Sequence, residues 1–69
     1  MMYVTVSKNI SSIIAERGLR KSFVAQRSGF TAQQFSDMLQ GRKLIRIEYL
    51  PRIADALGVS IPELYNHSA

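Results

Sequence analysis

The segment spanning residues 21–41, KSFVAQRSGFTAQQFSDMLQG, constrains the fold of this chain more than any other. Thr31 lies three residues before Gln34, which is the spacing of a capping box, in which each side chain pairs with a backbone N–H left open at a helix start. Phe30 and Phe35 flank this cap at the two positions of a hydrophobic staple. The segment therefore predicts two short helices that are joined by a tight turn and held at a fixed angle.

The whole chain of 69 residues predicts one all-α domain of five helices, because apolar residues recur at spacings of three and four and glycines follow them. A chain of this length has room for a single compact domain, here residues 1–69. Residues 1–6 and 66–69 are expected to be loose or edge segments. The expected helices cover about residues 7–16 (capped by Ser7), 21–28, 32–40, 48–57 (with Pro51 in the first turn) and 61–65 (with a capping box of Ser60 and Glu63).

Positive charge is concentrated in the middle of the chain. The net charge is +4, and six of the nine Lys and Arg residues lie within residues 20–46, which hold one acidic residue, Asp37. A basic surface on one side of a small domain is typical of a protein that binds a polyanion such as nucleic acid. The alternative is a solvated basic face that only keeps the protein in solution, and charge alone does not separate the two.

Residue content argues against an enzyme and predicts neither a metal nor a cofactor. The chain has no cysteine, its one histidine is His67 near the end, its acidic residues are scattered, and it has no glycine-rich phosphate loop. No apolar run approaches the ~18 residues of a membrane span, and the start lacks a secretory pattern. We therefore expect a cytoplasmic protein without a membrane partner.

The order of these elements closely resembles the phage repressor and Cro-like (XRE-type) helix-turn-helix family over about residues 7–65. The resemblance implies a compact, lambda-repressor-like domain that binds double-stranded operator DNA as a homodimer, with the helix at 32–40 in the major groove. The function implied is sequence-specific regulation of transcription, by a phage-type or mobile-element repressor. The matching residues are Leu19, Val24, Ala25, Gly29, Phe30, Thr31, Phe35, Met38, Gly41 and the run 53–59.

Helical periodicity within this motif separates an inward face from a candidate DNA-reading face. Phe35, Met38 and Leu39 fall on one side of the helix at 32–40 and should face the core. Gln33 can pair with adenine through two hydrogen bonds, while Asp37 can accept one from cytosine or orient a neighbouring side chain. The alternative for Gln33 is an ordinary polar helix surface. The candidate base contacts are Ala32, Gln33, Ser36 and Asp37.

Contacts to the DNA backbone are expected on both sides of the reading helix. The positive end of the helix at 21–28 can meet a phosphate, and cations follow the reading helix; the alternative for the latter is a solvated loop. Phe23 is expected to pack against the first helix, or otherwise to expose its ring. The candidate backbone contacts are Lys21, Ser22, Thr31, Arg42, Lys43 and Arg46.

The competing interpretation is an antitoxin or a protein-interaction module on the same fold, with DNA binding secondary or lost. Such a module needs an apolar surface for its protein partner. The sequence offers one in the group Leu44, Ile45, Ile47 and Tyr49, with Tyr65 and residues 1–4 as a second group. The alternative is that Leu44 and Ile47 only cap the core. The basic segment favours DNA binding, since a module that binds only proteins has no need of cations around the reading helix.

Overall fold

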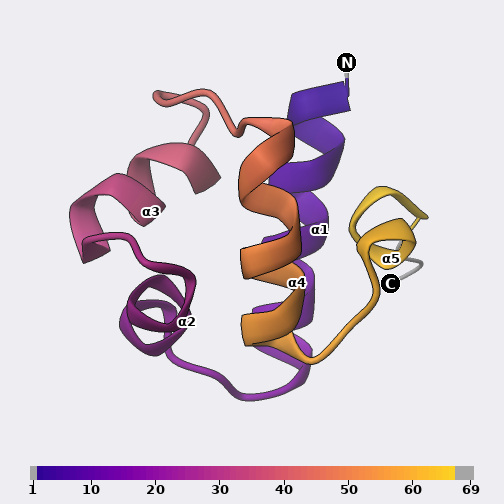
Figure 1. Cartoon of the computed structure of the whole chain (residues 1–69), viewed down its shortest axis with the longest axis horizontal. Helices are drawn as coiled ribbons and strands as arrows, with labels where there is room; N and C mark the ends of the chain where they lie inside the picture. The colour runs from indigo at the N-terminus through magenta and orange to yellow at the C-terminus, as the bar shows by residue number, and fades with distance from the viewer. Residues whose placement is uncertain (1, 67–69) are drawn as a thin grey trace.

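The computed structural model describes residues 2–66, and the side chains of residues 5–66. Within this range the chain is all helical and has no strand (Figure 1). The predicted all-α class of five helices is confirmed. The elements are α1 (Met2–Glu16), α2 (Lys21–Ser28), α3 (Ala32–Leu39), a 3-10 turn η1 (Ile47–Tyr49), α4 (Leu50–Leu57) and α5 (Ile61–Asn66).

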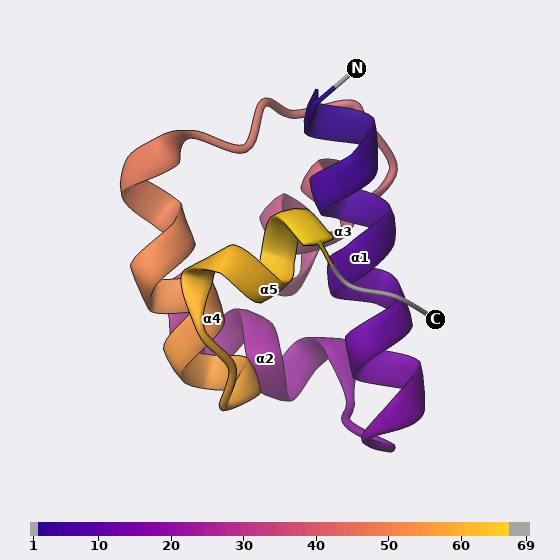
Figure 2. The same cartoon turned by 90° about the vertical axis from the view of Figure 1, so that its right-hand side faces the viewer.

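Helices α1, α4 and α5 form a support for the α2–α3 pair. In Figure 1, α4 stands in front of α1, with α2 and α3 on one side of them and α5 on the other. Figure 2 shows α5 lying across the space between α1 and α4, and it packs against both. Helix α2 packs on α4 and α3, while α3 also packs on α1. The orientation of the α2–α3 pair is therefore set by two separate helices of the support.

One apolar core joins all five helices. Ile10, Val24, Ile53 and Leu64 come from four different helices, and none of them has exposed surface. Phe35 on α3 is 1% exposed and belongs to the same cluster. Because every helix contributes at least one buried side chain, loosening one helix exposes the apolar surface of its neighbours.

The start of the first helix differs from the prediction. Helix α1 begins at Met2, so residues 2–6 are neither a loose tail nor an edge strand, and Ser7 is a buried residue inside the helix rather than its N-cap. Val6 is 4% exposed and extends the buried stripe of Ile10 by one helical turn. Burial of Val6 offsets the modest helix propensity of this β-branched residue.

The end of α5 and the start of α4 also differ from the prediction. Asn66 belongs to α5, so the expectation of a loose segment is wrong at that residue, whereas residues 1 and 67–69 lie outside the described part. Helix α4 begins at Leu50, not near Glu48, because a 3-10 turn precedes it. Pro51 does lie in the first turn, where its missing N–H costs no hydrogen bond.

The predicted capping box at α5 is present in part. The carboxylate of Glu63 accepts a hydrogen bond from the Ser60 backbone N–H at 3.0 Å, as the prediction requires. The Ser60 hydroxyl donates to the same carboxylate oxygen at 3.1 Å. Both bonds hold Ser60, which precedes α5, to Glu63 in the first turn of that helix.

Two left-handed glycines set the turns at the ends of α2 and α3. Gly29 has φ +85°, and beyond it the Phe30 N–H donates to the Ala25 carbonyl at 2.9 Å. Gly41 has φ +83°, and beyond it the Arg42 N–H donates to the Asp37 carbonyl at 2.8 Å. Residues with a Cβ rarely adopt this backbone conformation, so both positions favour glycine.

Candidate nucleic-acid interface

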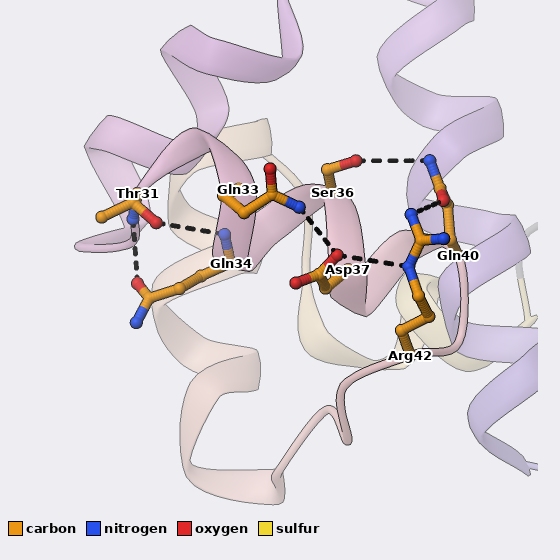
Figure 3. A network of polar contacts seen from close by, with 7 residues as sticks. All are labelled: Thr31, Gln33, Gln34, Ser36, Asp37, Gln40 and Arg42. Carbon is orange, nitrogen blue, oxygen red and sulfur yellow. Dashed lines mark hydrogen bonds and ion pairs between the residues drawn. The ribbon is translucent and has the colours of Figure 1, made fainter.

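The start of α3 is closed by a complete capping box (Figure 3). Thr31 Oγ1 accepts a hydrogen bond from the Gln34 N–H at 3.0 Å, and Gln34 Oε1 accepts one from the Thr31 N–H at 3.0 Å. The predicted box is confirmed. The Thr31 hydroxyl accepts within the box and keeps its own proton, which can be donated to an oxyanion.

The two faces of α3 differ as predicted. Phe35 and Met38 are each 1% exposed and point into the core. On the other face Ala32 and Gln33 are exposed, and Ser36 and Asp37 are half-buried. The structure therefore brings all four candidate base contacts to the outward side of one short helix.

A chain of hydrogen bonds links these outward residues to the segment that follows α3 (Figure 3). Gln33 Nε2 donates to Asp37 Oδ1 at 2.9 Å, and Arg42 Nε donates to the same oxygen at 3.3 Å. The Arg42 guanidinium also donates to Gln40 Oε1, and Gln40 Nε2 donates to Ser36 Oγ at 3.3 Å. The outward face of α3 is thus a connected polar surface in which one carboxylate oxygen is shared by two donors.

Arg42 is attached to Asp37 twice, by its backbone and by its side chain. The 2.8 Å bond from its N–H to the Asp37 carbonyl places the residue, and the guanidinium then meets the carboxylate. The Lys43 N–H donates to the same carbonyl at 3.2 Å. The sequence predicted Arg42 only as a contact to the DNA backbone and did not predict this link. The four-residue spacing of Gln33 and Asp37, which places two side chains on one helix face, could have indicated the Gln33–Asp37 bond but not the part of Arg42.

The other candidate backbone contacts lie at exposed positions at the start of α2 and in the segment after α3. Lys21 and Ser22 are exposed at the start of α2, where Arg20 occupies the N-cap position without making a side-chain capping bond. Lys43 is exposed after α3. Arg46 forms an ion pair with Glu48, and more than half of each side chain is exposed. The positive charge of Arg46 is therefore partly offset, while Lys21 and Lys43 present theirs to solvent.

The apolar residues near the site are distributed differently from the prediction. Phe23 is 46% exposed and lies under the Arg27 guanidinium at 5.8 Å, so the expectation that it packs in the core is wrong. The inward side of α2 is occupied instead by Val24, Ala25 and Ser28. The group proposed for a protein partner is split as well. Ile45 is buried and Tyr49 is half-buried against the core, while Leu44 is 53% exposed and Ile47 78% exposed.

Among the described residues, neither a metal-binding group nor a membrane-spanning helix is found. No group of three or more His, Asp or Glu side chains among these residues could hold a metal ion. None of the helices in residues 2–66 is both long and apolar enough to cross a membrane. His67 lies outside the described residues.

Two short helices joined by a glycine turn, with a polar outward face on the second, define a helix-turn-helix DNA-binding domain. The chain belongs to the Cro/C1-type HTH DNA-binding domain family, whose sequence profile matches residues 9–69. The predicted family is therefore confirmed. Members of this family are DNA-binding regulators of transcription.

A relative and a solved structure agree with this assignment. The chain is 39% identical over 59 residues to the uncharacterized HTH-type transcriptional regulator y4dJ of Sinorhizobium fredii (strain NBRC 101917 / NGR234), and the alignment covers 86% of this chain and 77% of that protein. It is similar in fold to the clp gene regulator ClgR from C. glutamicum, with a TM-score of 0.86 and 23% identity, covering 93% of this chain and 83% of that one. The second comparison supports the fold alone.

Proposed function

We propose that this protein is a sequence-specific regulator, acting as a dimeric repressor of phage or mobile-element type that reads the major groove with α3. The observation that carries the proposal is the outward face of α3. It presents Gln33, Ser36 and Asp37 beside an exposed Ala32, on a helix whose start is closed by the capping box. A short helix with a defined start and a polar outer face suits insertion into the groove. This is a binding role, and no catalytic role is assigned.

Base reading falls mainly to Gln33. Its carboxamide can accept from adenine N6 and donate to adenine N7 at the same time. Ala32 lies one residue earlier, and its small side chain lets the helix approach closely and can contact a thymine methyl group. Asp37 can accept from cytosine N4, although its first role is to hold Gln33.

Phosphate contacts would fix the helix in register. The positive end of α2 presents Lys21 and Ser22, and Thr31 can donate its hydroxyl proton at the start of α3. Lys43 is exposed in the segment after α3. Arg42 uses two of its five N–H donors on Asp37 and Gln40, which leaves three for a phosphate. Arg46 should contribute less, because Glu48 offsets its charge.

A homodimer would place two copies of α3 on a palindromic operator, with half-sites about 34 Å apart. A regulator of this kind would be found with the DNA that it binds, and we therefore include the predicted cytoplasmic location in this proposal.

A second candidate function is an antitoxin or protein-interaction module on the same fold. The supporting observation is the pair of apolar side chains that are exposed after α3. Leu44 and Ile47 are 53% and 78% exposed. A second copy of this chain or a different protein could cover them.

Selection of bound duplexes from a random DNA pool at near-physiological salt tests the proposal. Enrichment of a palindrome is the expected result. The control is Gln33→Ala, which should still fold but lose the preference at one base pair. If no sequence is enriched, and binding disappears as salt rises, the basic surface is a non-specific anchor and the protein-interaction module becomes the better interpretation.

A further inference from the structure

We propose that the Asp37–Arg42 pair determines which purine Gln33 reads, and that it favours adenine over guanine. This inference rests on the proposed function, since it assumes that α3 enters the major groove. It assigns Arg42 a positioning role that acts through Asp37, in addition to any phosphate contact.

The first step is the hydrogen-bonding capacity of the Gln33 side chain. A carboxamide has two N–H donors on one nitrogen and one carbonyl acceptor. Gln33 Nε2 donates one of its protons to Asp37 Oδ1 at 2.9 Å. A carboxylate accepts and cannot donate, so this bond also determines which end of the amide faces Asp37. One N–H and the carbonyl are left for DNA.

The second step is the pattern that each purine shows in the major groove. Adenine presents an acceptor at N7 and a donor at N6, whereas guanine presents two acceptors, at N7 and O6. The remaining N–H and carbonyl of Gln33 match adenine. Guanine would place its O6 acceptor opposite the amide oxygen of Gln33, which is also an acceptor, so no hydrogen bond could form there. An unrestrained glutamine could instead turn its NH₂ group toward guanine and donate both protons, and the bond to Asp37 removes that option.

The third step is the role of Arg42. Its Nε donates to the same Asp37 oxygen at 3.3 Å, and its backbone is tied to the Asp37 carbonyl at 2.8 Å. The guanidinium holds the carboxylate in place and offsets a negative charge that phosphates would repel. Without Arg42, Asp37 is free to turn toward solvent and Gln33 loses its restraint.

The exposure of Asp37 and Arg42 indicates that their bonds restrain Gln33 more strongly in the DNA complex than in the free protein. The Arg42 side chain is 64% exposed and that of Asp37 is 29% exposed, so water competes for these bonds before binding. An interface that excludes water strengthens hydrogen bonds among the groups that it encloses. The selection should therefore appear in the binding constants of the complex.

The test compares two duplexes that differ only by A·T or G·C at the base pair whose preference is lost in Gln33→Ala. The wild-type ratio of affinities should lie in the range of roughly 5- to 150-fold for one bidentate contact. Asp37→Asn should bring it close to one, because an asparagine can either accept from or donate to Gln33 and so permits both amide orientations. Arg42→Ala should lower the ratio as well.

Lys43→Ala is the matched control, since it removes one positive charge from the neighbouring exposed position. It should weaken both duplexes equally and leave the ratio unchanged. Circular dichroism melting checks that all four variants fold. If Gln33→Ala abolishes the ratio while Asp37→Asn and Arg42→Ala leave it intact, this inference is overturned and the proposed function stands. A wild-type protein that prefers no duplex at all would overturn both.

Discussion

The guanidinium of Arg52 lies 4.8 Å from the centre of the Phe30 ring, so a cation from α4 covers the turn between α2 and α3. It also lies 5.4 Å from the Tyr49 ring, which meets Phe30 edge to face at a centroid distance of 4.9 Å. A Cβ atom at Gly29 would lie 3.0 Å from Arg52 Nη1. These contacts attach the turn of the motif to the support. The hydrophobic staple expected between Phe30 and Phe35 stays a prediction.

Replacing Arg52 with alanine should lower the free energy of unfolding by about 0.5–1 kcal/mol, the range for a cation over an exposed aromatic ring. Urea denaturation measures the change. The control is Lys8→Ala, which removes an exposed cation from α1 and should shift stability by less than about 0.5 kcal/mol. Equal losses of stability in the two variants would show that the contact of Arg52 with the Phe30 and Tyr49 rings contributes nothing beyond its charge.

Replacing Ser28 with alanine should stabilise the protein. The Ser28 side chain is 1% exposed, and its hydroxyl makes no hydrogen bond within the described part of the chain. A buried polar group without a partner costs about 1–3 kcal/mol, so removing the hydroxyl should recover about 1 kcal/mol. Thermal melting should show a rise of about 4–8 °C for a domain of this size. Ser22→Ala, at an exposed position of the same helix, controls for helix propensity.

Asn9 connects the first and last helices. Its Nδ2 donates to the Leu64 carbonyl at 2.7 Å, across 55 residues of sequence. That carbonyl lies near the end of α5, where a helix leaves acceptors unpaired. Asn9→Ala should cost about 1 kcal/mol and speed amide hydrogen exchange in α5.

Asn9→Asp is the sharper variant, because a carboxylate has the same shape but cannot donate to the Leu64 carbonyl. It should destabilise at least as much as Asn9→Ala at neutral pH. Wild-type exchange rates in α5 for both variants would show that packing alone holds this helix.

Base contacts and phosphate contacts should respond differently to salt. Lys21→Ala should weaken all duplexes similarly and lower the salt slope of binding by about one. Gln33→Ala should cost roughly 1–3 kcal/mol at one base pair and leave that slope unchanged. Titrations of a selected operator and a scrambled duplex at several salt concentrations separate the two. Equal losses from Gln33→Ala on both duplexes would refute its base-reading role.

Local chemistry made the α2–α3 motif predictable. Glycine adopts a left-handed backbone conformation that other residues avoid, so Gly29 and Gly41 marked the helix ends without knowledge of the fold. The pairing of Thr31 with Gln34 needs only residues three apart, and it is present. The outward face of α3 followed from the helical period in the same way.

Features that depend on tertiary packing were harder to predict. Helix α1 starts earlier than predicted and includes Val6, whose burial in the core is a tertiary effect that local preference does not reveal. For Phe23, packing against the first helix was favoured over an exposed ring, although large apolar residues are often exposed on protein surfaces. The link from Arg42 to Asp37 depends on how the chain turns at Gly41, beyond the reach of helical spacing.

The sharing of one Asp37 oxygen by Gln33 and Arg42 has a consequence for how target sites are ranked. If α3 reads DNA as proposed, a base pair that draws Asp37 toward cytosine should also disturb the Gln33 amide at the neighbouring base. The energetic penalties of adjacent substitutions should then depend on one another, as they do for residues within one hydrogen-bond network. A scoring matrix that adds independent contributions from each position would misorder the weaker operators.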